Sequence, residues 1–370
     1  MRPLRIAIVI GTRPETIKLM PVVVAARARP DRFEVTIVRT GQHREVVDQL
    51  MDEFGLRADV NLDVMVPNQD LAHVLAESVR GLSAHFGRET PDWVLVQGDT
   101  TSTLAAALAA FYNRARIGHV EAGLRTGNRA SPFPEEANRS LTARLADLHF
   151  APTDSARANL LAEGIAAADI VLTGNTVVDA LLQTRALLQA NPPTGAAASP
   201  SRYILVTAHR RESHGAPLDH ICDAVVSLLD RHEELTAWLP MHPSPDVRKR
   251  LIGRLGGHPR ARLTPPLGYR DFIAALDGAA LVLTDSGGVQ EECAALGKPV
   301  LVMRSLTERA EAVDAGVAVI VGTDAEQIVS AGSSVLEDAE RRARMSRPSD
   351  AFGDGRASER ILEALLARTP

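Results

Sequence analysis

The sequence predicts an α/β protein with two doubly wound, parallel-sheet domains. Short apolar runs alternate with helical stretches along the whole chain, a pattern typical of parallel strands joined by right-handed crossovers. The chain has 370 residues, which is more than one ordinary hydrophobic core accommodates. A segment rich in proline, alanine and glycine, residues 190–200, divides the apolar runs into two series and is the predicted linker.

Ten apolar runs are predicted to be strands. The first series comprises Leu4–Ile10, Phe33–Val38, Trp93–Val96, Ile117–Val120 and Asp169–Leu172. The second series comprises Tyr203–Val206, Ala237–Leu239, Leu281–Leu283, Pro299–Val302 and Val317–Val321. Helical stretches of ten or more residues lie between most of these runs, which favours parallel pairing within each series.

The two series define the expected domains. Residues 1–173 are assigned to an N-terminal domain and residues 174–352 to a C-terminal domain. A last helix, about Ala357–Ala367, follows a glycine-rich turn and could close either domain. We assign residues 353–370 to a helix that packs back on the N-terminal domain.

Composition excludes several classes of function. The net charge of −5 argues against general nucleic-acid binding, which requires a basic face. Two cysteines far apart give neither a disulfide framework nor zinc-ligand spacing, so a reduced cytoplasmic setting is expected. No run is long and apolar enough to span a membrane, and Leu4–Ile10 is interpreted as a strand rather than a signal peptide.

Polar motifs follow five of the predicted strands. They are GTRPE after Ile10, QGDTTS after Val96, EAGLRT after Val120, TAHRRES after Val206 and TDSGG after Leu283. Ligands of doubly wound sheets bind beyond the carboxyl ends of the strands. We therefore expect these motifs to face one inter-domain cleft.

The turn Ser286-Gly287-Gly288 is predicted to hold a phosphate. It lies between a strand and a helix, where free N–H groups and the positive end of the helix dipole attract anions. Glu291 and Glu292 are expected in the first helical turn, where one of them could accept hydrogen bonds from a ribose diol. The alternative is an ordinary glycine turn whose acids merely suit the dipole.

Three carboxylates of the first domain are candidates for acid–base chemistry. Asp99 follows a strand, and its alternative role is a helix N-cap. Glu121 ends a buried strand and requires a partner, for which Arg125 and Arg139 are the candidates. Glu135 could pair with Arg139 on one helix face, while Glu136 is interpreted as a surface residue. Carboxylates that lie close together push their pKa values apart, which can provide both an acid and a base.

Cations, histidines and one aromatic side chain complete the candidate set. Arg13 and Lys18 bracket the start of the first helix and suit a diphosphate. His209 and His242 each follow a strand of the second domain and could protonate or stabilise an anionic leaving group. Phe272 could stack on a base, with core packing as its alternative.

Taken together, these segments resemble the non-hydrolysing UDP-N-acetylglucosamine 2-epimerases. The matching strings are GTRPETIKLMP (11–21), GQHRE (41–45), QGDTTST (97–103), GHVEAGLRTGN (118–128), PFPEEANR (132–139), GNTVVDAL (174–181), TAHRRES (207–213), LTDSGGVQEE (283–292), GKPVLVMR (297–304) and TERAEAV (307–313). They cover most of the chain in the expected order, and their combination is highly specific although no single string is.

The resemblance implies a glycosyltransferase-B-like fold of two Rossmann-like domains, with UDP bound by the second domain. It implies reversible conversion of UDP-GlcNAc to UDP-ManNAc without a metal, nicotinamide or other cofactor, through elimination of UDP to 2-acetamidoglucal and re-addition. The implied catalytic residues are Asp99, Glu121, Glu135 and His209. The implied substrate-binding residues are Arg13, Lys18, Arg139, His242, Phe272, Ser286, Gly287, Gly288, Glu292 and Arg309.

Some bacterial members of that family are activated by UDP-GlcNAc in a second pocket. Gln42, His43, Gln69 and Arg210 are the candidates for such a pocket here, although Asn68 and Asp70 depart from the family pattern. The resemblance also implies a homodimer that binds neither nucleic acid nor membrane. A hydrolysing epimerase that releases ManNAc and a glycosyltransferase of the same fold are the competing interpretations.

Overall fold

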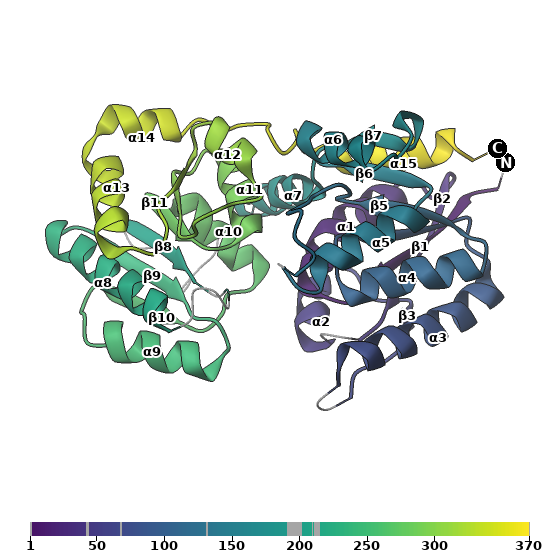
Figure 1. The fold of residues 1–370 in the computed structure, drawn as a ribbon, viewed down its shortest axis with the longest axis horizontal. Coiled ribbons are helices and arrows are strands. Elements are labelled where there is room, and N and C mark those ends of the chain that lie inside the picture. The colour runs from purple at the N-terminus through teal and green to yellow at the C-terminus, as the bar shows by residue number, and fades with distance from the viewer. Residues whose placement is uncertain are drawn as a thin grey trace. The chain divides into compact units, whose positions relative to one another are not determined.

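The computed structural model divides into two compact units, each built on one parallel sheet (Figure 1). It describes residues 2–41, 44–66, 69–130, 132–190, 202–208, 210 and 215–369. The first unit comprises Met1–Gln183 and Gly353–Pro370, and the second unit comprises Thr184–Phe352.

The first unit contains a seven-stranded sheet in the order β3-β2-β1-β4-β5-β6-β7, with every pair parallel. The order reverses between β1 and β4, which is the topological switch point where doubly wound sheets bind ligands. The strands are β1 (Leu4–Ile10), β2 (Phe33–Arg39), β3 (Val60–Asn61), β4 (Trp93–Gln97), β5 (Arg116–Val120), β6 (Leu148–Ala151) and β7 (Ile170–Leu172).

Helices cover both faces of this sheet. On one face α1 (Arg13–Arg27) packs against α2 (Arg44–Glu53) and α15 (Ala357–Ala367), over a core that includes Ile6 and Ile8. On the other face α4 (Thr101–Tyr112) packs between α3 (Leu71–Glu89) and α5 (Glu135–Leu145). The short helix α6 (Asp154–Ala162) and the 3₁₀ turn Ala167–Asp169 precede β7.

The second unit repeats the same strand order in a six-stranded sheet, β10-β9-β8-β11-β12-β13, again with every pair parallel. Its switch point lies between β8 and β11. The strands are β8 (Tyr203–Thr207), β9 (Thr236–Pro240), β10 (Ala261–Thr264), β11 (Leu281–Thr284), β12 (Val300–Val302) and β13 (Ala318–Ile320).

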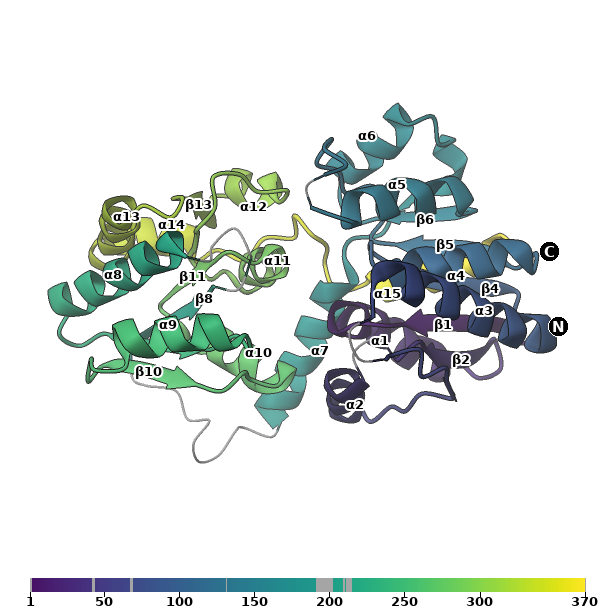
Figure 2. The ribbon, with the colours of Figure 1, turned by 60° about the horizontal axis from the view of Figure 1, so that its bottom comes forward.

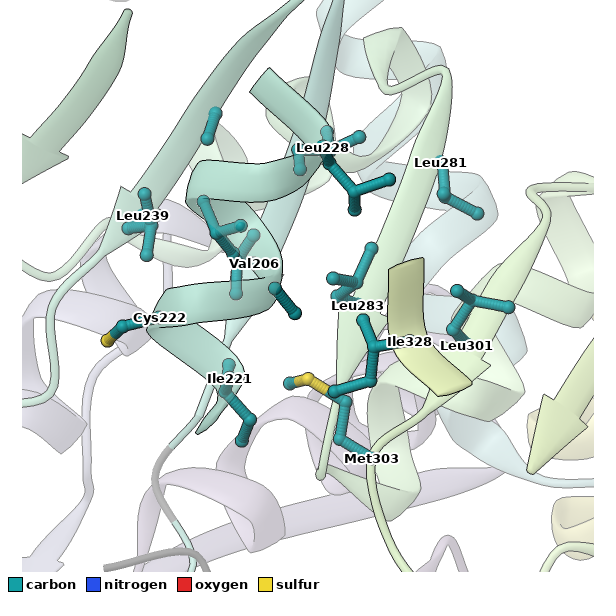
Figure 3. Close-up of a cluster of buried hydrophobic side chains, with 14 of the residues drawn as sticks. Val206, Ile221, Cys222, Leu228, Leu239, Leu281, Leu283, Leu301, Met303 and Ile328 are labelled. Carbon is teal, nitrogen blue, oxygen red and sulfur yellow. The ribbon is translucent and has the colours of Figure 1, made fainter. Parts of the chain in front are cut away.

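The larger core of the second unit lies under α8 (Ala216–Arg231), α9 (Pro245–Leu255) and α13 (Ala325–Glu337). Helices α8 and α13 lie side by side (Figures 1 and 2), and α14 (Ala339–Met345) packs on α13. Figure 3 shows how aliphatic side chains of α8 and α13 meet those of β8, β9, β11 and β12. The opposite face carries α10 (Tyr269–Gly278), where the carbonyl of Ala275 accepts a hydrogen bond from the Tyr203 hydroxyl. Helices α11 (Gly287–Leu296) and α12 (Ala310–Asp314) complete the unit.

The ten predicted strands are confirmed, but three further strands were not predicted. β3 is only two residues long, and β10 mixes polar and apolar residues of intermediate burial. β6 begins at Leu148, only three residues after the last residue of α5, Leu145. The sequence Leu148-His149-Phe150-Ala151 is too short for its periodicity to distinguish a strand from a continued helix.

The boundaries of the two units differ from those of the expected domains. The first unit extends to Gln183 rather than to residue 173, because α7 (Thr176–Ala190) begins on it. Asp179 of α7 accepts hydrogen bonds from the N–H groups of Ala357 (3.2 Å) and Ser358 (2.8 Å) at the start of α15. In Figure 1 the yellow helix α15 accordingly lies among the elements of the first unit. Apart from Ala190, the predicted linker lies outside the described residues.

Candidate active site

The predicted site residues of the first unit gather around the carboxyl ends of β1, β4 and β5. Glu121, directly after β5, has a backbone φ of 60°, a left-handed conformation that non-glycine residues rarely adopt. Its carboxylate is buried and accepts hydrogen bonds from Lys18 Nζ, at 2.6 Å to each oxygen. Asn175 Nδ2 donates to the same carboxylate at 3.2 Å, and Gln97 Nε2 donates as well. Three nitrogen atoms, one of them the Lys18 ammonium, therefore hold the Glu121 carboxylate in a fixed orientation.

The partner expected for Glu121 was wrong. Arg125 instead forms two hydrogen bonds with Glu163, of 2.6 and 2.9 Å. Lys18, which we expected on a diphosphate, reaches Glu121 from α1 because β1 and β5 both lie next to β4. This neighbourhood is created by the strand order and cannot be derived from spacing along the chain.

Asp99 is also paired with a cation. Arg139 donates to Asp99 Oδ2 from Nε (2.8 Å) and from Nη2 (2.6 Å), and to Glu136 Oε2 from Nη1 (3.0 Å). Glu136 was expected on the surface, but it is 2% exposed and accepts the N–H groups of Thr126 (3.0 Å) and Gly127 (3.1 Å). The guanidinium thus bridges two carboxylates, one at the site and one in the interior.

The alternative roles predicted for these acids, a helix N-cap for Asp99 and a pair with Arg139 for Glu135, are wrong as well. Thr100, not Asp99, caps α4, since its hydroxyl accepts the N–H of Thr103 at 3.1 Å. Glu135 begins α5, and its expected partner Arg139 is already bound by Asp99 and Glu136. One oxygen of Glu135, Oε2, is buried without a hydrogen-bond partner among the described residues. Such an atom requires a donor, which a bound substrate can supply.

A buried histidine supports the loop that carries Asp99. His119 Nε2 lies 2.7 Å from the carbonyl of Gly98, and burial lowers the pKa of His119 to about 3. The ring is therefore neutral at pH 7 and donates its Nε2 proton to that carbonyl. Its neighbour in the sheet, His149, is likewise neutral, because burial lowers its pKa to about 4.

In the second unit the turn after β11 begins helix α11, with Ser286 at the N-cap. Arg309 is buried and donates from Nε to Glu291 Oε1 at 2.7 Å. A Cβ atom on Gly287 would lie 3.3 Å from Arg309 Cζ, so the guanidinium packs directly against the first residue of α11. A fixed cation therefore adds to the positive end of the helix dipole.

Side chains also tie this turn to the segment before α12. Gln290 Nε2 donates to the carbonyl of Ser286 at 3.1 Å, and Thr307 Oγ1 donates to Gln290 Oε1 at 2.7 Å. A Cβ atom on Gly288 would meet no atom within 4 Å, which leaves space for a ligand to approach the main chain.

The acids of α11 lie one turn later than expected. Because α11 starts at Gly287, Glu291 and Glu292 fall in its second turn, and no acidic residue lies in the first. Glu291 is bound to Arg309, so Glu292 is the better candidate for a ribose diol. Both carboxylates are buried.

The remaining candidates are less defined. His242 follows β9 and accepts the N–H of Ser244 at Nδ1 (3.3 Å), while Phe272 is half-buried on α10. Gln69 accepts the N–H of Val66 at 3.0 Å, and the N–H of Arg210 donates to Asp285 at 2.9 Å. Arg13 begins α1 and is half-buried. Three candidates lie outside the described residues: Gln42, His43 and His209.

Sequence reasoning missed four polar residues that organise the first unit's site: Glu15, Gln97, Glu136 and Asn175. All four stand inside strings already singled out, so their position in those strings was a usable signal. Among the described residues, no group of three or more His, Cys, Asp or Glu side chains could hold a metal ion. None of the described helices has the length and apolarity needed to cross a bilayer.

Comparison with known proteins shows the family of the chain. A sequence model described as UDP-N-acetylglucosamine 2-epimerase matches residues 25–366. A Ralstonia nicotianae protein named probable UDP-N-acetylglucosamine 2-epimerase is 45% identical over 98% of this chain and 99% of its own length.

Two solved structures have the same fold. One, a protein of Listeria monocytogenes described as a putative UDP-N-acetylglucosamine 2-epimerase, has a TM-score of 0.93 and 43% identity, covering 99% of this chain and 96% of the other. A Neisseria meningitidis UDP-GlcNAc 2-epimerase bound to UDP-GlcNAc has a TM-score of 0.92 and 39% identity, covering 99% and 100%. The predicted glycosyltransferase-B-like fold class is confirmed, and the chain belongs to the UDP-N-acetylglucosamine 2-epimerase family.

Proposed function

We propose that this protein interconverts UDP-GlcNAc and UDP-ManNAc by inverting C2 of the sugar, without hydrolysis. The observation that carries the proposal is the carboxylate set of the first unit, where Asp99 and Glu121 are each held by a cation and Glu135 keeps an unpartnered buried oxygen. The phosphate-binding turn of α11 in the second unit supports it.

The chemistry explains why such a set is required. C2 of the sugar has no neighbouring carbonyl carbon, so its proton cannot be removed alone at a useful rate. A carboxylate takes the C2 proton while the C1–O bond breaks and UDP leaves with the electron pair, which forms 2-acetamidoglucal. UDP then adds back to C1 while an acid delivers a proton to the other face of C2.

The ion pairs of the three carboxylates indicate their roles. Glu121 is paired with Lys18 and Asp99 with Arg139, and a carboxylate held in place by a cation is assigned as the base. Glu135 forms no ion pair with any residue that the structure describes, so Glu135 is assigned as the acid that protonates C2 on the way to UDP-ManNAc. In the reverse direction the same group acts as the base.

The second unit would bind the nucleotide. N–H groups at the start of α11, together with Arg309, suit the diphosphate and bind it both in the substrate and after it departs. Glu292 is assigned to the ribose, Phe272 to the base and His242 to the diphosphate region. From the family resemblance, Arg13 and His209 remain candidates for stabilising the departing UDP.

The decisive experiment follows the reaction in D₂O by NMR. We expect deuterium at C2 of the product and only traces of free UDP. Protium at C2 of the product would contradict elimination with solvent exchange. Stoichiometric UDP with free ManNAc would establish the hydrolysing alternative, and a requirement for an added acceptor would establish a glycosyltransferase.

We also propose that the protein is a homodimer. Phe111 (57% exposed), Tyr112 (65%) and Leu141 (54%) are large apolar side chains on the neighbouring helices α4 and α5. The exposure of these neighbouring apolar side chains is explained by a second copy of the chain that covers them. Light scattering of the purified protein should give a dimer mass, and Phe111→Glu with Leu141→Glu should give a monomer.

We place this activity in the cytoplasm, because the two cysteines, Cys222 and Cys293, are buried and unpaired. Its product would serve as an activated sugar for glycosyl transfer into cell-envelope polysaccharides or glycoconjugates. Growth of a deletion strain with and without exogenous ManNAc-containing glycan precursors would test that assignment.

A further inference from the structure

Glu15 is a buried carboxylate for which the proposed mechanism has no role. It is the third residue of α1 and is 2% exposed. One oxygen, Oε2, accepts the N–H groups of Gly11 at 2.5 Å and Thr12 at 2.6 Å. The other oxygen, Oε1, accepts the hydroxyl of Thr103 at 3.0 Å and also that of Thr100.

These four donors belong to two different loops. Gly11 and Thr12 form the turn from β1 into α1, directly before Arg13. Thr100 directly follows Asp99 and caps α4. Thr103 lies in the first turn of α4 and shares its one hydroxyl proton between Glu15 (3.0 Å) and the carbonyl of Gln97 (2.6 Å). One carboxylate therefore joins the loop that carries a candidate leaving-group cation to the loop that carries a candidate base.

The junction between these two loops, formed by Glu15 and its four donors, has little freedom to rearrange. A Cβ atom on Gly11 would lie 2.3 Å from Ser102 Oγ, so the two loops are already in contact. β1 and β4 are neighbours in the sheet, with Ile8 opposite Leu95. Burial raises the pKa of Glu15, while its hydrogen bonds act in the opposite direction. A buried carboxylate with converging donors is costly to form, and a purely structural junction could use neutral groups.

We propose that Glu15 is a positioning residue for the epimerisation: by holding both loops, it fixes the placement of Asp99 relative to Arg13. The inference rests on the proposed function. Misplacing these groups should harm the return of UDP to the bound glucal more than the binding of substrate, because re-addition requires the reacting atoms to be aligned. The enzyme would then lose the intermediate to solvent.

The test is the partition of the intermediate in Glu15→Gln. Glutamine keeps the shape but replaces one acceptor by an NH₂ group that faces N–H or O–H donors. We expect kcat to fall about tenfold to hundredfold, KM to change by less than about threefold, and the ratio of free UDP to epimer to rise at least about tenfold. This ratio is a property of each folded molecule, so a mere loss of folded enzyme cannot change it.

Asp179→Asn is the matched control. Asp179 is another buried carboxylate of the first unit that accepts two backbone N–H groups, but its partners are on α15. We expect a lower melting temperature with the wild-type ratio of UDP to epimer. Thr103→Val removes one donor from Glu15 and should raise the ratio in the same direction by a smaller factor, which keeps the inference testable if Glu15→Gln does not fold.

A wild-type ratio in both Glu15→Gln and Thr103→Val would overturn the inference, as would an equal rise in Asp179→Asn. The wild-type protein is measured first in the same assay. If it does not epimerise UDP-GlcNAc, the proposed function fails, and that result is distinct from a failure of the positioning role.

Discussion

The two units share one strand order but solve different electrostatic problems with it. At its switch point the first unit gathers carboxylates, of which Glu121 is paired with Lys18 and Asp99 with Arg139. At the equivalent point the second unit presents a helix N-terminus and Arg309. The charge of Arg309 is neutralised by an ion pair with Glu291.

This difference shows where each kind of chemistry must be encoded. Backbone N–H groups at a helix start suffice for binding an anion, so a glycine-rich turn visible in the sequence carries most of the second unit's role. Proton transfer needs particular carboxylates in particular charge states. In the first unit those carboxylates are paired with Lys18 of α1 and Arg139 of α5.

The largest expected effect tests the roles of the carboxylates in the first unit. Glu135→Gln should allow elimination from UDP-GlcNAc but block protonation on the other face, so kcat for epimerisation should fall by roughly 10²–10⁴. From UDP-GlcNAc, some UDP and glucal should still form, whereas from UDP-ManNAc the first step should be lost. NMR of both reactions distinguishes these results.

Asp99→Asn is the companion variant. Arg139 keeps its contact with Glu136, so the fold should tolerate the change while elimination from UDP-GlcNAc is lost. If Glu135→Gln and Asp99→Asn instead behave identically from both substrates, the assignment of acid and base is wrong.

The second unit should respond through binding instead of chemistry. Gly287→Ala places a Cβ atom 3.3 Å from Arg309 Cζ and should displace the guanidinium. Because the diphosphate is bound in both ground and transition states, KM for UDP-GlcNAc should rise about tenfold with a smaller loss in kcat. Gly253→Ala, on α9 with nothing within 4 Å, is the control and should leave both constants unchanged. An unchanged KM in Gly287→Ala would remove this turn from the nucleotide site.

Acid should destabilise the first unit before the second. His119 and His149 have folded pKa values of about 3 and about 4, below the ordinary 6.5, because both are buried. In the unfolded chain these histidines bind protons at a higher pH than in the folded protein. The contribution of each neutral histidine to the free energy of unfolding is therefore fully present above pH 6.5. It falls by about 1.4 kcal/mol per pH unit as the pH drops from 6.5 to the folded pKa.

In the second unit Glu308 behaves differently. Burial opposes its ionisation, but the hydrogen bond from Arg304 prevails and lowers its pKa from 4.5 to about 2. Its contribution is therefore lost only as the pH falls from 4.5 toward 2. Hydrogen exchange at pH 7 and pH 5 should show loss of protection in β5 and β6 but not around β12. Equal protection of β5 and β6 at both values would contradict this order.

The smallest expected effect concerns substrate activation. If Gln69 and Arg210 line a second UDP-GlcNAc site, the reaction started from pure UDP-ManNAc should show a lag that traces of UDP-GlcNAc abolish. Gln69→Ala should lengthen the lag while the maximal rate changes less than about twofold. A progress curve that starts without a lag would indicate an unregulated enzyme.

The sequence by itself determined the α/β class, the ten main strands and the position of every polar motif at a strand end. These features are local, because apolar runs bounded by glycine and polar residues define buried parallel strands and their termini. The chain also carries enough family strings to indicate the reaction. It could not reveal β3, β6 or β10, whose short or mixed sequences lack a distinctive period.

Only the tertiary structure decided which charges are paired. Lys18 meets Glu121, Arg139 meets Asp99 and Glu136, and Glu15 joins two loops, because the strand order 3-2-1-4-5 brings β1, β4 and β5 together. Spacing along a helix favoured a pair between Glu135 and Arg139, yet burial of Glu136 redirected the guanidinium inward. A charge in a protein interior takes the partner that best offsets its desolvation, and that partner is chosen in space and not along the chain.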